Sequence, residues 1–208
     1  MGVQTYLNAI ANGRGMAKSN LYSVYFGGEK VITELEQNFN GLRSKAGDRI
    51  SKVGERVLLM CDEVSLPGIQ SSTGSVVRHP GSNPIYYPTN PIYNDLQLSF
   101  MCDSEMQALN FLVQWREKIY KKVGNSSEPS YQVNYPEDYQ CTLYIEKNER
   151  DSSSEIGQTP LTYTVRGAWP YSLDSIPLSY GSSQLVKVTV NFYYRNWSAE
   201  FEGLETIT

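Results

Sequence analysis

The sequence contains one histidine, His79, among 208 residues, and this scarcity excludes most catalytic and metal-binding arrangements. A Ser-His-Asp arrangement, or a metal site built on a histidine pair, would need every other group to converge on that residue. The glycine-rich phosphate-binding and dinucleotide-binding motifs are also missing. A pair of carboxylates acting on a glycosidic bond stays open, because the spacing that decides such chemistry is not visible in a sequence. The sequence favours no enzyme, and we expect no cofactor and no metal.

Cysteines are few, and long apolar runs are missing. Cys61, Cys102 and Cys141 are odd in number and far apart, which predicts reduced, buried thiols rather than a disulfide framework or a zinc site. No run of 18 apolar residues occurs, and the first 26 residues lack the apolar stretch of a signal peptide. We therefore expect a protein that is made in the cytoplasm and does not enter a membrane.

Basic residues are outnumbered, since 18 Lys and Arg stand against 22 Asp and Glu, for a formal net charge of -4. Proteins that bind nucleic acid tightly depend on clusters of Lys and Arg. If this acidic protein comes close to DNA, it must do so despite repulsion between its carboxylates and the DNA phosphates. A hydrophobic content of 40% is sufficient for one sizeable core. We expect a single domain over residues 1–208.

Alternation of apolar and polar residues predicts a mainly β fold. In residues 20–26, Tyr22, Val24 and Phe26 share one face. Residues 57–64 form a mostly apolar run that predicts a buried strand, and Pro67-Gly68 after it suits a type II turn. The same alternation recurs at residues 96–100, 141–145, 161–165 and 186–194. So many one-faced strands predict a two-sheet antiparallel sandwich or barrel.

One flanking α-helix is predicted between about residue 104 and Gly124. Ser104 and Gln107 fit a capping box, and Lys118, Lys121 and Lys122 suit the C-terminal end. The apolar stripe that would pack on a sheet consists of Ala108, Leu112, Trp115, Ile119 and Val123.

Two segments are less regular. Residues 29–56 have apolar residues at helical spacing, but Gly41 and Gly47 interrupt them. We interpret this segment as an inserted, broken amphipathic helix at the surface or at an interface, with a flexible insertion as the alternative. Residues 69–95 hold four prolines and several tyrosines and predict an extended loop, whose aromatic side chains would bury against another subunit.

Residues 166–197, "RGAWPYSLDSIPLSYGSSQLVKVTVNFYYRNW", resemble the C-terminal signature of the tail tube proteins of contractile-tailed bacteriophages. In that family a strand ends in Gly-x-Trp-Pro, and a short link leads to a long alternating strand with an aromatic-rich end. Other stretches match in the same order: "SNLYSVYF", "MCDEVSLPG" and "IYNDLQLSFMCDSEMQALNFLVQW". The resemblance spans residues 19–197, and the insertion at 29–56 departs from the compact family pattern.

The resemblance implies a structural protein of the virion that assembles in the host bacterial cytoplasm. Hexameric rings would stack into a tail tube inside a contractile sheath, and DNA would pass through the lumen without specific binding. Partners would be other copies of the chain, the tail sheath protein, and the baseplate or initiator and terminator proteins of the tube. A relative at the tube end and a secretion tube that passes effector proteins are alternatives. The 16 tyrosines also suit a carbohydrate-binding β-sandwich.

A ring of this kind is geometrically reasonable. If each subunit contributes four strands, the shared barrel of six subunits has about 24 strands and, at a tilt of about 40°, a backbone diameter of about 48 Å. A duplex could pass through such a channel after side chains are subtracted. Closure would also remove the exposed sheet edges that invite uncontrolled pairing.

Two sets of residues are candidates for roles in the tube. Contacts between subunits are expected from Leu66, Pro67, Gly68, Tyr86, Tyr87, Tyr93, Trp169 and Pro170. The lumen wall is expected from the strand positions that face away from the core, namely Asp95, Gln97, Ser99, Thr142, Tyr144 and Glu146. A wall of acids and neutral polar groups would repel the DNA backbone and keep it moving.

Overall fold

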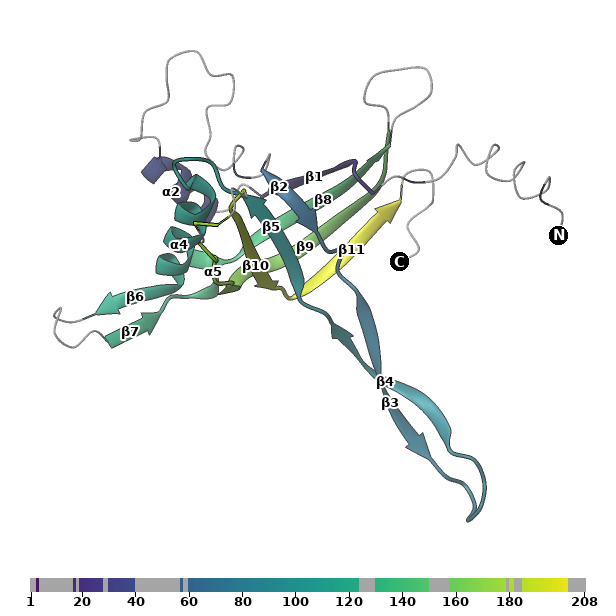
Figure 1. Cartoon of the computed structure of the whole chain (residues 1–208). Helices are drawn as coiled ribbons and strands as arrows, with labels where there is room; N and C mark the ends of the chain where they lie inside the picture. Colours follow the sequence, from purple (N-terminus) through teal and green to yellow (C-terminus); the bar gives the residue numbers. More distant parts are fainter. Residues whose placement is uncertain are drawn as a thin grey trace.

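The structure is a computed structural model that describes residues 3, 17, 19–27, 30–39, 57, 60–123, 130–149, 158–178, 180–181 and 185–201. Antiparallel strands dominate it, as the sequence predicts (Figure 1). The strands are β1 (Tyr22–Phe26), β2 (Cys61–Val64), β3 (Ile69–Val76), β4 (Ile85–Tyr93), β5 (Leu96–Met101), β6 (Tyr120–Val123), β7 (Ser130–Val133), β8 (Cys141–Glu149), β9 (Gln158–Leu173), β10 (Lys187–Tyr193) and β11 (Asn196–Phe201). The helices are α2 (Lys30–Phe39), α4 (Gln107–Ile119) and α5 (Pro136–Tyr139).

The long strand β9 joins two halves of the main sheet. Its N-terminal part pairs with β8 and β11, and its C-terminal part pairs with β10. We call β1-β8-β9-β11 the first half-sheet and β9-β10-β5-β2 the second half-sheet. Between the two parts lies Gly167, whose φ of 68° is a left-handed conformation that residues with a Cβ rarely adopt. A Cβ there would also lie 3.4 Å from the side chains of Gln140 and Arg195.

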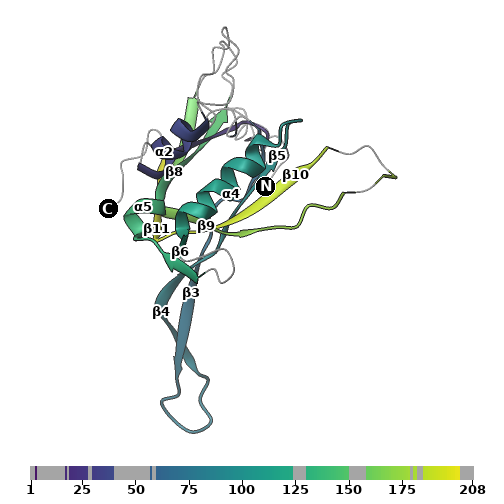
Figure 2. The same cartoon turned by 90° about the vertical axis from the view of Figure 1, so that its left-hand side faces the viewer.

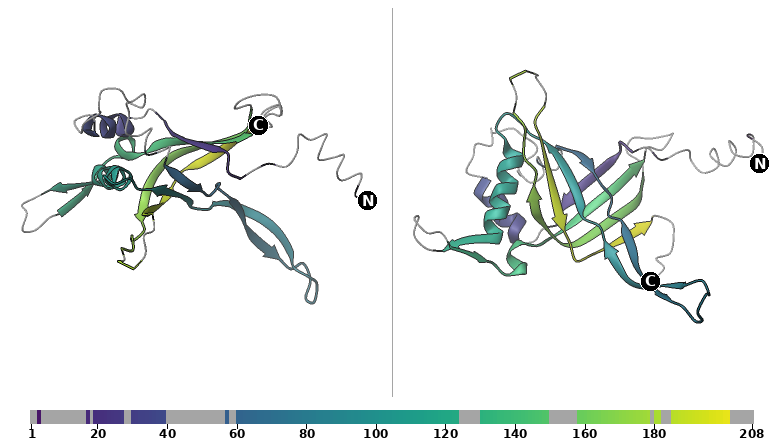
Figure 3. Two further views of the ribbon diagram at one scale, coloured as in Figure 1. Left: turned by 45° about the horizontal axis from the view of Figure 1, so that its top comes forward. Right: turned by 60° about the horizontal axis from the view of Figure 1, so that its bottom comes forward.

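Both half-sheets bury their inner faces in one core. The first supplies Val24, Leu143, Ile145 and Val165, and the second supplies Leu96, Leu98, Phe100, Val188, Val190 and Phe192. The edge strands β1 and β2 meet where the Tyr22 hydroxyl donates a hydrogen bond of 3.0 Å to the carbonyl oxygen of Cys61. The two half-sheets therefore form two layers, whose outer faces point away from one another (Figure 3). The prediction of a mainly β fold of antiparallel strands is confirmed.

Helix α4 closes one side of this core. Trp115 packs edge-on against Phe26 of β1 and against Phe192 of β10, with ring centroids 5.5 and 5.8 Å apart. Its indole Nε1 donates a hydrogen bond of 2.8 Å to the carbonyl oxygen of Tyr139 in α5. The predicted stripe is buried at Ala108, Leu112, Trp115 and Ile119, and Phe111 joins it.

Both predicted ends of this helix are wrong. The helix begins at Gln107, and the backbone N–H of Gln107 donates to Oδ1 of Asp103 at 2.8 Å, so Ser104 forms no capping box. The helix ends at Ile119, because the chain then enters β6 and pairs with β7. Val123 and the two lysines before it are therefore exposed hairpin residues, and Gly124 lies outside the described residues.

The inserted segment begins with a helix that belongs to the core. Val31, Ile32 and Leu35 of α2 are buried, and Glu34 forms an ion pair of 2.7 Å with Lys118 of α4. Residues 40–56 lie outside the described residues, so the break predicted at Gly41 and Gly47 stays a prediction. In the run at 57–64, a strand is confirmed only from Cys61 onward, since Val57 is buried but not in a strand. The predicted burial of this strand is wrong, because Asp62 and Glu63 are exposed and Cys61 and Val64 are only half-buried.

The segment from Ser65 to Asn94 is a long β-hairpin. Gly68 does not have the positive φ that a type II turn requires, and the chain continues extended from β2 into β3. The predicted turn at Pro67-Gly68 and the predicted loop at 69–95 are both wrong in conformation. Strands β3 and β4 pair along their length and project away from the body as an arm (Figures 1 and 2). Pro88 and Pro91 are tolerated because each strand of a two-stranded hairpin has a free edge.

Candidate assembly surfaces

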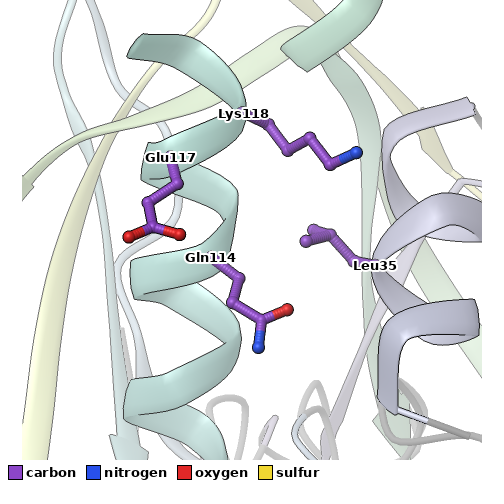
Figure 4. A pocket seen from close by; sticks show the side chains of 4 residues that line it. All are labelled: Leu35, Gln114, Glu117 and Lys118. Carbon is purple, nitrogen blue, oxygen red and sulfur yellow. The ribbon is translucent and has the colours of Figure 1, made fainter. Parts of the chain in front are cut away.

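No constellation of catalytic groups stands out within the described ranges. A pocket of about 410 Å³ lies between α2 and α4, lined by Leu35, Gln114, Glu117 and Lys118 (Figure 4). Lys118 is held by Glu34, and no nucleophile and base meet there. His79 lies in the turn at the end of the arm. Among the residues that the structure describes, no three His, Cys, Asp or Glu side chains could share a metal ion.

The three cysteines are free thiols, but only Cys141 is fully buried, and Cys61 and Cys102 are half-buried. Burial raises the pKa of the Cys61 thiol to about 12, so it is protonated and unreactive at neutral pH. In the part of the chain that is described, no helix is long and apolar enough to cross a membrane.

Most residues of the arm are exposed. Every residue of β4 is exposed, and residues 69–93 contain no Asp or Glu. Tyr86 is 68% exposed, whereas the neighbouring Tyr87 faces the other side of the strand and covers Gly74. An isolated two-stranded hairpin is at best marginally stable in water. An arm with this much exposed apolar surface is therefore typical of a contact with another molecule.

The other expected contact residues differ in exposure. Leu66 and Tyr93 are exposed, with the Tyr93 ring 6.0 Å from that of Tyr194. Gly68 and Trp169 are half-buried. Pro67 and Pro170 are buried inside the subunit, so they support the surface from beneath and do not form it.

The outer face of the second half-sheet is polar and uncharged at its centre. Gln97 lies opposite Asn191, and Ser99 lies opposite Thr189, with 3.1 Å between the two hydroxyl oxygens of the second pair. Ser99 is only 7% exposed because neighbouring side chains cover this short residue. At one end of the face, Lys187 forms an ion pair with Asp62. We call this surface the polar face.

An aromatic patch adjoins the polar face where β9 pairs with β10. Tyr171 stacks on Tyr193 with ring centroids 3.9 Å apart, and Trp169 lies 5.6 Å from Tyr193. The Tyr171 hydroxyl donates a hydrogen bond of 2.6 Å to Oδ2 of Asp95, and chiefly this bond raises the pKa of Tyr171 to about 12. Asp95 is thus tied to a tyrosine at the border of the face.

The remaining lumen candidates lie on the other side of the subunit. Thr142, Tyr144 and Glu146 belong to β8, on the outer face of the first half-sheet, where Tyr144 lies opposite Tyr25 and Glu146 opposite Ser23. Because the two outer faces point apart, one channel can be lined by only one of the two sets. The alternation along each strand indicates which side chains point away from the core. It does not indicate whether the outer faces of the two half-sheets point in the same direction.

Two further exposed surfaces escaped the sequence prediction. The connection between β9 and β10 exposes Leu178, Tyr180 and Leu185. The β6–β7 hairpin exposes Tyr120, Val123, Tyr131 and Val133. The apolar residues within the Ser-, Gly- and Pro-containing link of residues 174–186 were an available signal for the first. The second was hidden because its first strand continues the helical pattern of α4.

Comparisons with solved structures find the same fold in contractile injection systems. A chain of an extracellular contractile injection system, the PVC sheath-tube complex in its extended state, matches with a TM-score of 0.53 and 13% identity, over 89% of this chain and 92% of that one. A chain of the anti-feeding prophage baseplate matches with a TM-score of 0.52 and 15% identity, over 91% and 98%. The tube-terminating cap of the anti-feeding prophage gives a TM-score of 0.52 at 12% identity, over 89% and 91%.

Sequence comparison is more specific than the fold. Among curated proteins, none matches this chain. The sequence model of the phage tail tube protein family matches residues 17–200, which include the core, the arm and both half-sheets. The chain therefore belongs to the phage tail tube protein family.

Proposed function

We propose that this protein forms hexameric rings that stack into the tail tube of a contractile-tailed phage, through which DNA is ejected. The observation that supports this most is the family match over residues 17–200. The exposed arm fits the same role, because its apolar surface needs a neighbouring subunit to cover it.

The polar face of the second half-sheet is our candidate for the lumen wall. Its central side chains, Gln97, Ser99, Thr189 and Asn191, are short or medium in length and carry no charge. A wall without free Lys or Arg offers DNA phosphates no strong ionic contact, so a duplex could slide along it. The arm also continues directly from β2 and β5 of this half-sheet, so it would extend the wall toward a neighbour.

The proposed partners follow from this arrangement. Other copies of the chain would pair laterally and stack axially, a sheath protein would surround the tube, and baseplate and terminator proteins would bind its ends. The solved structures that share the fold come from a sheath-tube complex, a baseplate and a tube-terminating cap. We place the protein in the virion tail, assembled in the cytoplasm of a bacterial host.

A tube that carries proteins in an injection system is the second candidate. It is favoured by the solved structures with this fold, since these belong to contractile injection systems. Isolation of assembled particles distinguishes a phage tail tube from an injection-system tube, because a phage tail is attached to a DNA-filled head. Particles without a head that hold protein inside the tube would support the second candidate.

Electron microscopy of the purified protein, with sedimentation velocity across a range of concentrations, tests the proposed function. We expect rings of six subunits and hollow tubes of uniform width. Rings that never stack would indicate a relative from the tube end. A species that stays monomeric at high concentration, even with tube-initiating proteins, would contradict the proposal, and its retention on glycans would favour a carbohydrate-binding module.

A further inference from the structure

A second groove lies on the side of the subunit where α4 meets the β6–β7 hairpin. Its volume is about 470 Å³. The lining residues come from the outer face of α4 and one face of the hairpin: Val113, Arg116, Glu117, Tyr120, Lys122 and Tyr131. The apolar side chains Val113, Tyr120 and Tyr131 are all exposed at 40% or more. The groove thus combines an apolar floor with two cations.

Hydrogen bonds at both ends of the hairpin hold the walls of this groove in place. The backbone N–H of Asn134 donates to the carbonyl oxygen of Ile119 at 3.0 Å, and its side-chain Nδ2 donates to that of Lys118 at 2.6 Å. At the far end, the Ser130 hydroxyl donates to the carbonyl oxygen of Val123 at 2.6 Å. Because the walls are preformed, binding in the groove would cost little ordering entropy.

The groove has an excess of positive charge in an acidic protein. Arg116 and Lys122 form no ion pair with any residue that the structure describes, and Glu117 is the one carboxylate in the lining. Lys121 lies on the opposite face of the same strand and does not line the groove. An acidic segment with apolar side chains would complement this surface.

Such a segment begins at the end of β11. Glu200 and Phe201 are exposed, and the sequence continues as Glu202, Gly203, Leu204 and Glu205. Glu200 forms no ion pair within the described part of the chain. The end of β11 and the β6–β7 hairpin lie on opposite sides of the subunit (Figures 1 and 3). In a ring of head-to-tail contacts, opposite sides of adjacent copies face each other.

We propose that the groove between α4 and the β6–β7 hairpin receives the acidic stretch that starts at Glu200 of the neighbouring copy in the ring. This inference rests on the proposed function, because it assumes a ring. Phe201 would cover part of the exposed apolar floor, while Glu200 would face the cations Arg116 and Lys122. Such a contact would set the direction in which subunits join.

Charge exchange tests the pairing. We expect Arg116→Glu with Lys122→Glu to raise the concentration needed for ring formation about tenfold, and Glu200→Lys with Glu202→Lys to do the same. Combining all four changes should restore rings, because the attraction is then present with its signs exchanged. Lys121→Glu, on the other face of β6, is the matched control and should assemble like the unmodified protein. Circular dichroism of each variant checks that the subunit is folded.

A labelled peptide of residues 198–208 provides a test that does not require rings. Fluorescence anisotropy should show binding to the unmodified subunit, and the Arg116→Glu, Lys122→Glu variant should abolish it. Normal rings in both charge-reversed variants would overturn the inference and leave the proposed function intact. Normal rings in the groove variant together with loss of sheath binding would also overturn it, and would assign the groove to the sheath. An unmodified protein that never forms rings would contradict the proposed function, and the peptide measurement would then decide on the groove.

Discussion

Single residues of this subunit have conformations and pKa values that their neighbours impose. Tyr171 and Tyr22 have pKa values raised to about 12, the first chiefly by its hydrogen bond to Asp95 and the second chiefly by burial. An unfolded tyrosine titrates near pH 10. Because the folded pKa lies above the unfolded one, this contribution to stability is fully present below about pH 10 and is lost as the pH rises through 12. We expect stability to fall between pH 10 and 12.

Denaturant unfolding at increasing pH, with tyrosinate absorbance recorded alongside, measures this effect. Tyr171→Phe removes the donor to Asp95, so the alkaline loss of stability should be smaller in that variant. Tyr180→Phe is a matched control, because Tyr180 is fully exposed. Equal alkaline behaviour of Tyr171→Phe and the unmodified protein would show that the hydrogen bond contributes nothing.

Gly167 is the second residue whose environment predicts a measurable effect. Gly167→Ala would place a Cβ in a left-handed backbone conformation, at a cost of about 1–2 kcal/mol, at the bend where β9 passes between the half-sheets. We expect the midpoint of denaturant unfolding to fall accordingly. Gly81, at the end of the arm, also has a left-handed backbone conformation, but a Cβ at this position would contact no neighbouring atom. Gly81→Ala therefore serves as the comparison. If both variants unfold like the unmodified protein, the bend does not depend on glycine.

At the scale of elements, the arm assigns different roles to two adjacent tyrosines. Tyr87 covers Gly74 and so helps the arm to hold its own shape, whereas Tyr86 points to the opposite side. We expect Tyr86→Ala to leave the unfolding free energy unchanged to within about 0.5 kcal/mol and to shorten tubes. Tyr87→Ala should instead speed hydrogen exchange in β3 and β4.

Tube lengths in electron micrographs and hydrogen exchange of the isolated subunit check these two outcomes. Thr89→Ala, in the same strand, tests whether any substitution in the arm is sufficient to shorten tubes. Tubes of normal length from Tyr86→Ala would exclude this tyrosine as an anchor between rings.

At the scale of the whole molecule, the two layers decide which side chains would meet DNA in the proposed tube. Gln97→Lys and Glu146→Lys each place a cation on one of the two outer faces. If the polar face lines the lumen, Gln97→Lys should slow DNA ejection most at low ionic strength, and Glu146→Lys should not. Asp95 is less suitable for this test because it holds Tyr171.

Ejection rates of virions carrying each variant tube, measured across salt concentrations, separate the two faces. Both variants should form tubes of normal length, because neither position lies in the core. Slowing by Glu146→Lys alone would mean that the first half-sheet lines the channel.

The sequence by itself determined several strands of the main sheet, their inner faces and the helix that covers the core. In a strand with one buried face, apolar residues recur at every second position, as at Leu96, Leu98 and Phe100. In a helix they recur at every third or fourth position, as at Leu112 and Trp115. The family resemblance was also present in the order of the motifs. Element ends were less predictable, because the start of α4 depends on Asp103 and its end on pairing between β6 and β7.

Only the tertiary structure decided how these parts face one another. The hairpin conformation of residues 69–93 depends on cross-strand pairs that no local pattern of prolines reveals. The separation of Gln97 from Glu146 onto opposite sides depends on the bend of β9 at Gly167. The groove near Arg116 exists because a helix and a hairpin meet there. Contacts between residues distant in sequence decide each of these features. Such contacts produce no repeating pattern of residue types in the sequence from which they could be predicted.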